Sequence, residues 1–255
     1  MFTSIDYDKF RALRVTHVAT RFEELIQDET NDTLTPEQMF LTAIDYALEQ
    51  RQHSRVEKLI RQAKFLIPTA SVAKLDYRDG RGITPVRMRR YATHSWRADP
   101  TNLPIISPSG GGKSYLACAI GISACLPEHT VTYTRMDSLA RRLIISRSDG
   151  IAHQKLLNEL SDADLLIIDD FLTVGIDSDV ASDLFAVLAN REHRLPTMIA
   201  SQSWPAYWVE ALPDRVAEDS IVNRLANHSR TINPGRIDMR KLRDDHARAD
   251  KNHWE

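Results

Sequence analysis

A glycine-rich segment at residues 107–114 reads SPSGGGKS and has the residue types that bind phosphate groups. Glycines let backbone N–H groups turn inward around phosphates without Cβ clashes, and a lysine after them can reach the β and γ phosphates. An apolar, strand-like run at 103–106 precedes the segment, and a helical run follows it. The helix N-terminus would add its positive dipole end. This order of strand, loop and helix predicts a phosphate-binding loop for ATP, with Lys113 as the phosphate ligand.

The predicted ATP ligands come from the loop and from the first residues of the helix. They are Ser109, Gly110, Gly111, Gly112, Lys113, Ser114 and Tyr115. The hydroxyl of Ser114 is the group that would hold Mg²⁺ beside the phosphates. Ser107 departs from the usual G-x-x-x-x-G-K-S/T pattern, because it stands where the first glycine is expected. We expect Ser107 to tighten or distort the start of the loop; by itself, the segment could also be a glycine-rich turn with a surface lysine.

An unbroken apolar run at 165–168 ends in two adjacent carboxylates, Asp169 and Asp170. Such a run is typical of a central strand in a parallel sheet, and ligands bind at the carboxyl ends of those strands. Adjacent like charges are costly unless a cation or a water shell balances them. We therefore predict that Asp169 holds the Mg²⁺ shell and that Asp170 orients or deprotonates the water that attacks the γ-phosphate. The alternative is an acidic pair that only starts a turn.

Two further polar residues are weaker catalytic candidates. Gln202 follows the apolar run at 197–200, and a polar side chain there would lie beside the attacking water. Arg224 lies in a helical stretch at 216–226 and, if subunits assemble, could reach the γ-phosphate of a neighbour. Each could instead be an ordinary polar residue at a strand end or on a solvated helix face.

Apolar patterning predicts the elements that position these residues. Short apolar runs alternate with amphipathic helical stretches, and they lie at 103–106, 131–134, 165–168 and 197–200. Alternation of this kind predicts an α/β fold with a parallel sheet that is flanked by helices. Before it, helical spacing from 34 to 66 and a capping signature at 35–38 predict a small N-terminal helical domain. Prolines and glycines between 68 and 85 predict a linker.

Charge is distributed unevenly along this chain of 255 residues, which has a formal net charge of -2. Basic residues far outnumber acidic ones between 51 and 97, and several fall at helical spacing. Such a face could follow the phosphate backbone of double-stranded DNA without reading its sequence. The predicted DNA-binding residues are Arg51, Arg55, Lys58, Arg61 and Lys64. A solvated helix face without any partner is the alternative.

Hydropathy argues against a membrane protein. No apolar run approaches the roughly 18 residues of a membrane span. The first residues, with Asp6, Asp8 and Lys9 among them, lack the apolar core of a secretory signal. We therefore expect a cytoplasmic protein.

Five ordered motifs in this chain resemble those of the IstB-type ATPases, which assist insertion-sequence transposases and are similar to the helicase loader DnaC within the AAA+ class. The motifs are GGGKSYLA at 110–117, DLLIIDDF at 164–171, ASQ at 200–202 with Trp208 downstream, IVNRL at 221–225 and MRK at 239–241. The resemblance extends from about Leu34 to Arg240.

The resemblance implies roles for several residues and for the parts of the chain. Gln202 would be the first sensor, Arg224 an arginine finger and Arg240 a phosphate contact, with nucleotide between the subunits of a homo-oligomer. Leu172 stands where the family commonly has a glycine, and Asp170 replaces the usual glutamate, so a shorter base predicts slower hydrolysis. We divide the chain into an N-terminal helical domain with DNA and partner contacts, a basic linker, an AAA+ ATPase core and a charged tail, at 1–70, 71–100, 101–240 and 241–255.

The leading hypothesis is an ATP-dependent, DNA-binding transposition helper. Its ATP-bound subunits would assemble on target DNA and recruit or stimulate the transposase of the same element, and hydrolysis would release the assembly. A replicative helicase loader of the DnaC type is an alternative that shares every motif. A nucleotide-binding adaptor that hydrolyses little is less favoured because the acidic pair is present, and a small-molecule kinase because no lid arginines or acceptor-pocket signature are found.

Overall fold

The computed structural model describes residues 1–93, 98, 100–213 and 215–242, apart from the side chains of 215–219. The chain separates into two compact units, Met1–Lys58 and Leu59–Glu255. Their boundary falls inside one long helix, α3 (Pro36–Ala63). The division predicted at residues 70, 100 and 240 stays a prediction. Most of the predicted charged tail lies outside the described residues, as does Arg97 of the basic segment.

The first unit is helical. It consists of α1 (Ser4–Ala12), α2 (Thr16–Gln27), the short helix η1 (Glu29–Asn31) and the first part of α3. A capping box begins α3, as the sequence predicts, because the N–H of Thr35 donates to Gln38 Oε1 at 2.9 Å and the N–H of Gln38 donates to Thr35 Oγ1 at 3.2 Å. A cluster of aromatic rings joins α1 to α2 and is formed by Phe2, Tyr7, Phe10 and Phe22.

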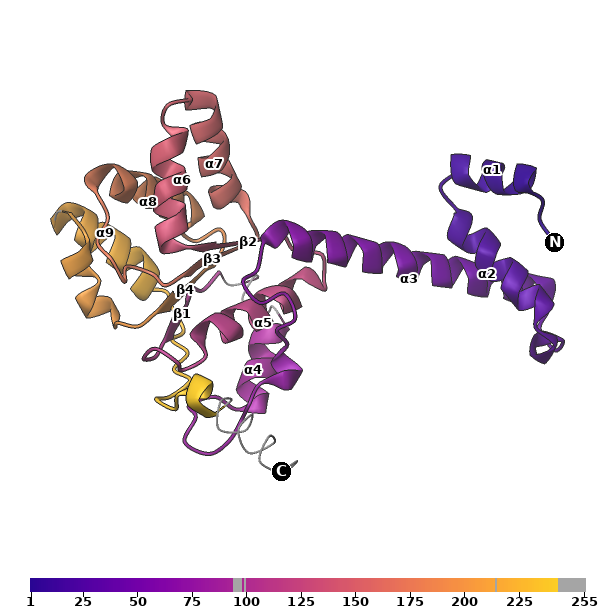
Figure 1. The fold of residues 1–255 in the computed structure, drawn as a ribbon, viewed down its shortest axis with the longest axis horizontal. Helices are drawn as coiled ribbons and strands as arrows, with labels where there is room; N and C mark the ends of the chain where they lie inside the picture. Colours follow the sequence, from indigo (N-terminus) through magenta and orange to yellow (C-terminus); the bar gives the residue numbers. More distant parts are fainter. Residues whose placement is uncertain (94–97, 99, 214, 243–255) are drawn as a thin grey trace, which may run out of the picture. The chain divides into compact units, whose positions relative to one another are not determined.

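The second unit contains a four-stranded parallel sheet (Figure 1). Its strands are β1 (Leu103–Ile106), β2 (Val131–Arg135), β3 (Leu165–Asp169) and β4 (Thr197–Ser201), and they lie in the order β1-β4-β3-β2. Each predicted strand is observed, and the last three extend one polar residue further at their carboxyl ends. The predicted α/β fold with a parallel sheet is therefore confirmed.

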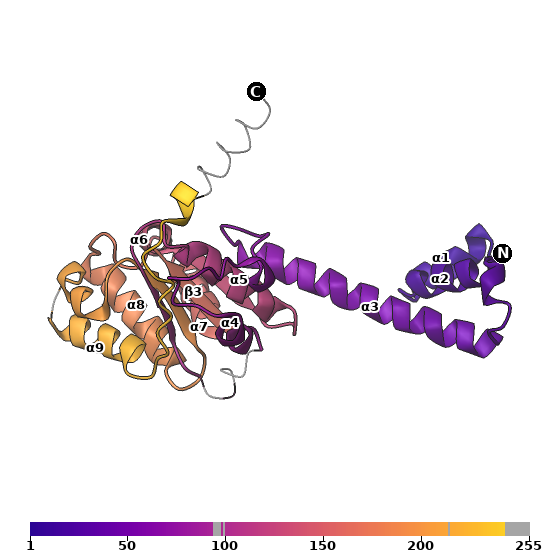
Figure 2. The same cartoon turned by 90° about the horizontal axis from the view of Figure 1, so that it is seen from below.

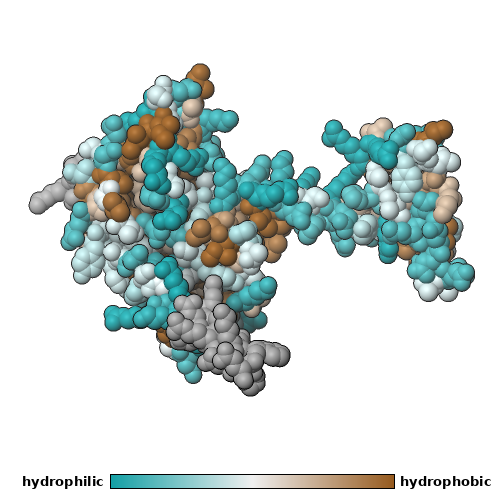
Figure 3. Space-filling model, viewed as in Figure 1, coloured by the Kyte–Doolittle hydropathy of each residue, from teal (hydrophilic) through white to brown (hydrophobic). Residues whose placement is uncertain are grey.

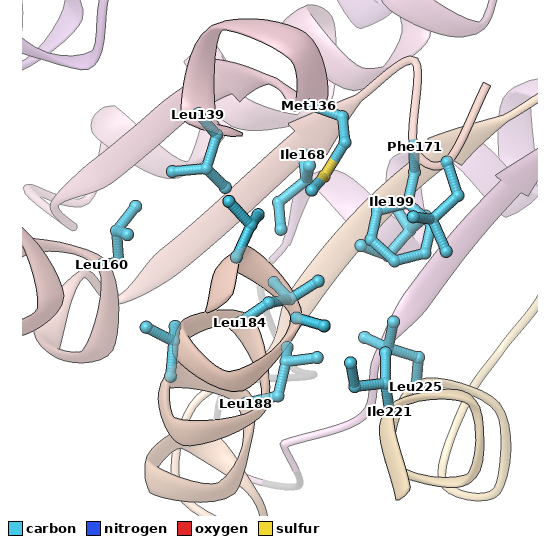
Figure 4. Close-up of a cluster of buried hydrophobic side chains, with 14 of the residues drawn as sticks. Met136, Leu139, Leu160, Ile168, Phe171, Leu184, Leu188, Ile199, Ile221 and Leu225 are labelled. Carbon is cyan, nitrogen blue, oxygen red and sulfur yellow. The ribbon is translucent and has the colours of Figure 1, made fainter. Parts of the chain in front are cut away.

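Helices cover both faces of this sheet (Figures 1 and 2). One face carries α5 (Lys113–Cys125), with α4 (Pro85–Ala92) beside it; the other carries α6 (Met136–Ser146), α7 (Gly150–Asp162), α8 (Ser178–Arg191) and α9 (Arg215–Ala226). Side chains alternate along a strand, so Leu166 and Ile168 of β3 enter the large apolar core under α6 to α9 (Figure 4), while Ile167 packs under α5.

A further segment closes the edge of the sheet beside β1. Residues 228–232 run parallel to β1, since the N–H of Asn102 donates to the carbonyl of His228 and that of Ile106 to the carbonyl of Ile232, both at 2.9 Å. Pro104 lies between these donors and has no N–H, so it donates no bond to the ladder, but its carbonyl accepts from the N–H of Ile232 at 2.7 Å. The chain after residue 232 therefore leaves the sheet at the carboxyl end of β1, next to the glycine-rich loop.

Three short helices lie in the connections of the second unit. They are η2 (Val72–Lys74), η4 (Pro205–Tyr207) and η5 (Val209–Ala211). Apolar side chains are exposed at the tip between α6 and α7, where Ile144, Ile145 and Ile151 lie at the surface (Figure 3). None of the described helices is both long and apolar enough to cross a membrane.

Candidate nucleotide-binding site

A cavity of about 690 Å³ lies where the glycine-rich loop joins α5. The predicted site residues that line it are Ser109, Gly110, Gly112, Lys113, Ser114, Tyr115, Asp170, Gln202 and Arg240. The φ angles of Gly110 and Gly112 are +83° and +86°, in the left-handed region that other residues rarely adopt. Because α5 begins directly after Gly112, its N-terminus adjoins the cavity and favours an anion there.

Lys113 lies buried at the mouth of the loop, with 6% of its surface exposed. Its Nζ donates to the carbonyls of Ser107 at 2.7 Å and Pro108 at 2.9 Å. Burial lowers the pKa of Lys113, and the carboxylates of Asp169 and Asp170 oppose that change. A buried ammonium held only by neutral carbonyls is well suited to gain charged phosphate oxygens as acceptors.

Ser107, which replaces the expected first glycine, is accommodated by Gly111 across the loop. Ser107 is 3% exposed, and a Cβ added to Gly111 would lie 2.2 Å from its Oγ and 3.0 Å from its Cβ. Gly111 does not have a positive φ, so its backbone does not require glycine. Its missing side chain instead makes room for the hydroxymethyl group of Ser107. This compensation explains how the loop keeps its fold with serine at the first position.

The compensation predicts a coupling between the two positions. Gly111→Ala should shift the loop away from the shape that binds phosphate, and restoring that shape should reduce ATP binding by up to the usual overpacking cost of roughly 1–3 kcal/mol. Ser107→Gly should change ATP binding little. In the double variant most of the loss should be recovered, although the Pro108 carbonyl would still lie 3.2 Å from the new methyl group. Calorimetric titration of all four proteins with ATP measures the coupling. Losses that add within about 0.5 kcal/mol would contradict it.

The two carboxylates after the apolar run of β3 occupy different environments. Asp169 shares a face of the sheet with Ile167 and is completely buried, while the side chain of Asp170 is 34% exposed and lines the cavity. Asp169 accepts hydrogen bonds from the Tyr133 hydroxyl at 2.6 Å and from the Asp170 N–H at 2.9 Å. Burial raises the pKa of Tyr133, so its phenol stays a proton donor. Asp169 is thus fixed in orientation, whereas Asp170 is accessible.

An arginine that the sequence analysis missed contacts Asp170. Arg135 ends β2, where its Cα is paired in register with that of Asp169, and its Nη2 lies 3.1 Å from Asp170 Oδ2. Its position at the end of a predicted strand was the available signal, because parallel strands end at the same edge of a sheet. The contact could not be inferred from this position alone, because it depends on the strand order, which places β2 next to β3.

Backbone strain marks the turn that follows the acidic pair. Asp170 and Leu172 have φ angles of +50° and +48°. Aspartate tolerates this region, but leucine does so at a cost. Leu172 is 6% exposed and belongs to the apolar core, so burial of its side chain offsets the strain. The leucine where the family commonly has a glycine therefore does not prevent the left-handed turn.

Gln202 follows β4, the strand that lies between β1 and β3. Strand order thus places this side chain between the glycine-rich loop and the acidic pair. The preceding residue fixes the strand end, because Ser201 Oγ donates to the Phe171 carbonyl at 3.1 Å and accepts from Trp208 Nε1 at 3.0 Å. Trp208 itself is fully buried against the ring of Phe171. The polar end of β4 is therefore held rigidly beside the cavity.

Residues that precede β1, together with one residue of the C-terminal segment, complete the cavity and were not predicted as site residues. They are Leu66, Ile67, Lys74, Leu75, Asp76, Arg81 and Met239. Arg81 was counted only as part of the basic segment, although the glycines on either side of it signal a close backbone approach. Arg240 was predicted, and its charge acts on Lys113 by contributing to the lowered pKa of that lysine. The C-terminal segment after residue 232 thus reaches the loop.

Arg224 lies away from this cavity. It lines a second cavity of about 440 Å³ together with Asn102 and Thr197, which stand at the amino ends of β1 and β4. Its Nε lies 2.9 Å from Glu192 Oε2 without forming a hydrogen bond, and its guanidinium lies 4.6 Å from the ring centroid of Phe185. The structure therefore does not bring Arg224 to the nucleotide site of its own subunit, and a role in a neighbouring subunit stays a prediction.

The predicted DNA-binding residues all have exposed side chains. Arg51, Arg55 and Lys58 lie on α3 within the first unit, and Arg51 donates a short hydrogen bond to the carbonyl of Arg14. Arg61, on the last turn of α3, and Lys64, just after it, belong to the second unit. None of these residues contributes to the nucleotide cavity.

Strand order, loop and acidic pair together define a P-loop ATP-binding protein of the AAA+ fold. The family model for the IstB-like ATP binding proteins matches residues 8–247, and the chain belongs to this family. It is 30% identical to y4pL of Sinorhizobium fredii, which is named as an insertion sequence ATP-binding protein, over 88% of this chain and 91% of that protein. It is 25% identical to the protein named for ATP binding in insertion sequence IS21 of Pseudomonas aeruginosa, over 87% and 83% of the two chains.

Solved structures support the fold. A crystal structure of DnaI matches with a TM-score of 0.54 and 21% identity, and covers 67% of this chain and 90% of that chain. AMPPCP-bound DnaA from Aquifex aeolicus matches with a TM-score of 0.57 and 18% identity. That match covers 69% of this chain, which spans only 54% of the DnaA chain. At these identities the similarity establishes the AAA+ core and nothing further about activity.

Proposed function

We propose that this chain is an ATP-dependent, DNA-binding transposition helper that works in the cytoplasm. ATP-bound subunits assemble on double-stranded target DNA, with nucleotide at their interfaces, and recruit or stimulate the transposase of the same element. Hydrolysis of ATP then drives disassembly. The observation that carries this proposal is the convergence of the phosphate-binding loop, Asp170, Gln202 and Arg240 on one cavity in a chain of the IstB-like family.

The side chains fit ATP with Mg²⁺. Mg²⁺ prefers oxygen ligands, keeps several waters and needs only one or two protein groups when phosphates supply the rest. Ser114 offers a hydroxyl within the cavity. Asp169 offers a carboxylate that the hydrogen bond from Tyr133 holds in place, although Asp169 does not line the cavity. Bound Mg²⁺ would neutralise charge on the β and γ phosphates. In the described residues no three His, Cys, Asp or Glu side chains gather as a metal site, which is compatible with an ion held partly by phosphate.

Each predicted site residue has a separate role in ATP hydrolysis. Lys113 binds the β and γ phosphates, Asp170 accepts a proton from the attacking water, and Gln202 orients that water. Arg224 of an adjacent subunit would stabilise charge on the γ-phosphate after leaving its ion pair with Glu192.

ATP-dependent assembly on duplex DNA tests the proposal. Light scattering and ATP turnover would be followed with ATP, with ADP and without nucleotide, for the parent chain and for Lys113→Ala. We expect large DNA-bound assemblies only for the parent chain with ATP. Binding of ATP without assembly or DNA contact would favour an adaptor, and co-purification with a replicative helicase in place of the transposase would favour a loader.

We expect the exposed basic residues of α3 in the first unit to contact DNA. Changing Arg55 and Lys58 together to glutamine should weaken duplex binding and lower the slope of log affinity against log salt by about 2, because each phosphate contact contributes roughly 0.9. The affinity for ATP should not change. Lys9 and Arg11, also exposed in the first unit, give a control pair with the same loss of charge. Equal losses in the two pairs would show that net charge, and not this face, binds DNA.

The ion pair of Arg135 with Asp170 is expected to lower kcat for ATP hydrolysis. Arg135 Nη2 holds Asp170 Oδ2 at 3.1 Å, so the carboxylate must give up this contact before that oxygen can face the attacking water. Because both partners are partly exposed, the effect is small, of the order of 0.5–1 kcal/mol. Arg135→Gln should therefore raise kcat about two- to fivefold without a change in KM for ATP. Arg142→Gln, which breaks a similarly exposed pair with Glu159, is the control, and a fall in kcat for Arg135→Gln would reverse the interpretation.

A further inference from the structure

Arg81 links three separate segments around the glycine-rich loop. Its Nη1 donates to the carbonyl of Asp76 at 2.8 Å, its Nη2 to that of Gly111 at 3.2 Å and its Nε to that of Pro234 at 3.4 Å. The three acceptors belong to the segment before the core, to the loop and to the C-terminal segment. Burial lowers the pKa of Arg81, as expected for a guanidinium held by neutral carbonyls and not by a carboxylate.

Close backbone packing holds Arg81 in place. A Cβ on Gly82 would lie 2.2 Å from the carbonyl oxygen of Asn233, so only glycine lets the two segments cross at this point. The C-terminal segment continues from the crossing and donates the N–H of Met239 to the carbonyl of Gly110 at 2.9 Å. Two consecutive loop carbonyls, those of Gly110 and Gly111, are therefore held by donors outside the loop.

The hydrogen bond from Arg81 to the Gly111 carbonyl also fixes the direction of the next N–H group, because the peptide bond between them is planar. A trans peptide is planar, and its C=O and the following N–H point in opposite directions. With the carbonyl of Gly111 directed at Arg81, the N–H of Gly112 points away from Arg81. In a phosphate-binding loop, backbone N–H groups of this kind bind the α and β phosphates. Arg81 also lines the cavity and lies within 3.3 Å of where a Cβ of Gly112 would be.

We propose that Arg81 is a positioning residue of the nucleotide site, which orients the Gly111–Gly112 peptide for phosphate binding and ties the loop to the segments on both sides of the core. The inference rests on the ATP-binding role of the loop. It assigns a function to a residue that acts through the backbone and not by direct participation in hydrolysis. Lysine cannot replace it, because one ammonium does not reproduce the planar fork that reaches three carbonyls.

Nucleotide affinity in three variants of the full chain tests this role. Arg81→Gln and Arg81→Lys should each weaken binding of fluorescent ATP and ADP analogues about tenfold, the factor expected when a hydrogen bond from a charged group is lost. The factor should be equal for both nucleotides, since both carry α and β phosphates. KM should rise while kcat at saturating ATP stays within about threefold. Arg89→Gln, at an exposed arginine of α4, removes the same charge and should change neither quantity.

The outcomes separate this inference from the proposed function. If the parent chain binds no ATP, both are overturned. If the parent chain binds ATP and Arg81→Gln binds it equally well, only the role of Arg81 is overturned. Full affinity in Arg81→Lys would also overturn it, because charge alone would then suffice. A fall in kcat with unchanged KM and dissociation constant would show loss of folded protein, which thermal unfolding without nucleotide would detect, and would reject a positioning role.

Discussion

Replacement of Lys113 by alanine is expected to lower the affinity for ATP by about a hundredfold or more. Removing one partner of a buried charged contact costs roughly 3–5 kcal/mol, and about 1.4 kcal/mol corresponds to each factor of ten. Lys113 is buried in the loop, so water cannot replace its ammonium beside the phosphates without rearrangement. Calorimetric titration with Mg-ATP measures the loss. Lys155→Ala, at an exposed position of α7, is the control and should bind ATP as the parent chain does.

Thermal unfolding distinguishes lost binding from lost folding in this variant. Because burial lowers the pKa of Lys113, the folded chain holds the charged form less favourably than the unfolded chain does. Alanine removes that cost, together with the hydrogen bonds to Ser107 and Pro108. We therefore expect an unliganded Tm close to that of the parent chain, and a much smaller rise in Tm than the parent shows when ATP is added. An ATP-induced rise equal to that of the parent would contradict the assigned role of Lys113.

Replacement of Arg191 by methionine is expected to lower the free energy of unfolding by roughly 3 kcal/mol or more. Arg191 is 1% exposed, and its guanidinium donates to the carbonyls of Leu160, Ser161, Ala163 and Pro196 at 2.6–3.2 Å, as well as to Thr197 Oγ1 at 3.1 Å. These acceptors lie at the end of α7, before β3 and at the start of β4. Methionine fills similar space but leaves buried carbonyls without their donor, and each such group costs about 1–3 kcal/mol.

Part of this loss should be recovered, because burial also disfavours the charge itself and lowers the pKa of Arg191 to about 9. Urea unfolding followed by tryptophan emission measures the net effect, and it reports on the second unit because all four tryptophans of the chain, the buried Trp208 among them, belong to that unit. Arg142→Met is the control, since Arg142 is half-buried beside Glu159 at the surface and should matter by less than about 0.5 kcal/mol. A change below about 1 kcal/mol for Arg191→Met would mean that the carbonyls find other donors.

The sequence by itself determined the parts of the site that depend on neighbouring residues. The order of strand, glycine loop and helix around 107–114, and the apolar run that ends at Asp169, are local patterns, and the structure confirms both elements. Side chains alternate between the two faces of a strand, so the sequence also determines that Asp169 lies on the same face of the sheet as Ile167. Such features follow from backbone geometry over a few residues, and no knowledge of distant segments is needed.

Only the tertiary structure decided which distant side chains meet. The strand order places Gln202 between the loop and the acidic pair and places Arg135 beside Asp170, although nothing in either local sequence specifies a neighbour. The crossing of the segments around Gly82 and Asn233 brings Arg81 to the loop from a stretch that looked only basic. These contacts depend on packing between residues far apart in the chain, and hydrophobic periodicity carries information on burial but not on which buried surfaces are paired.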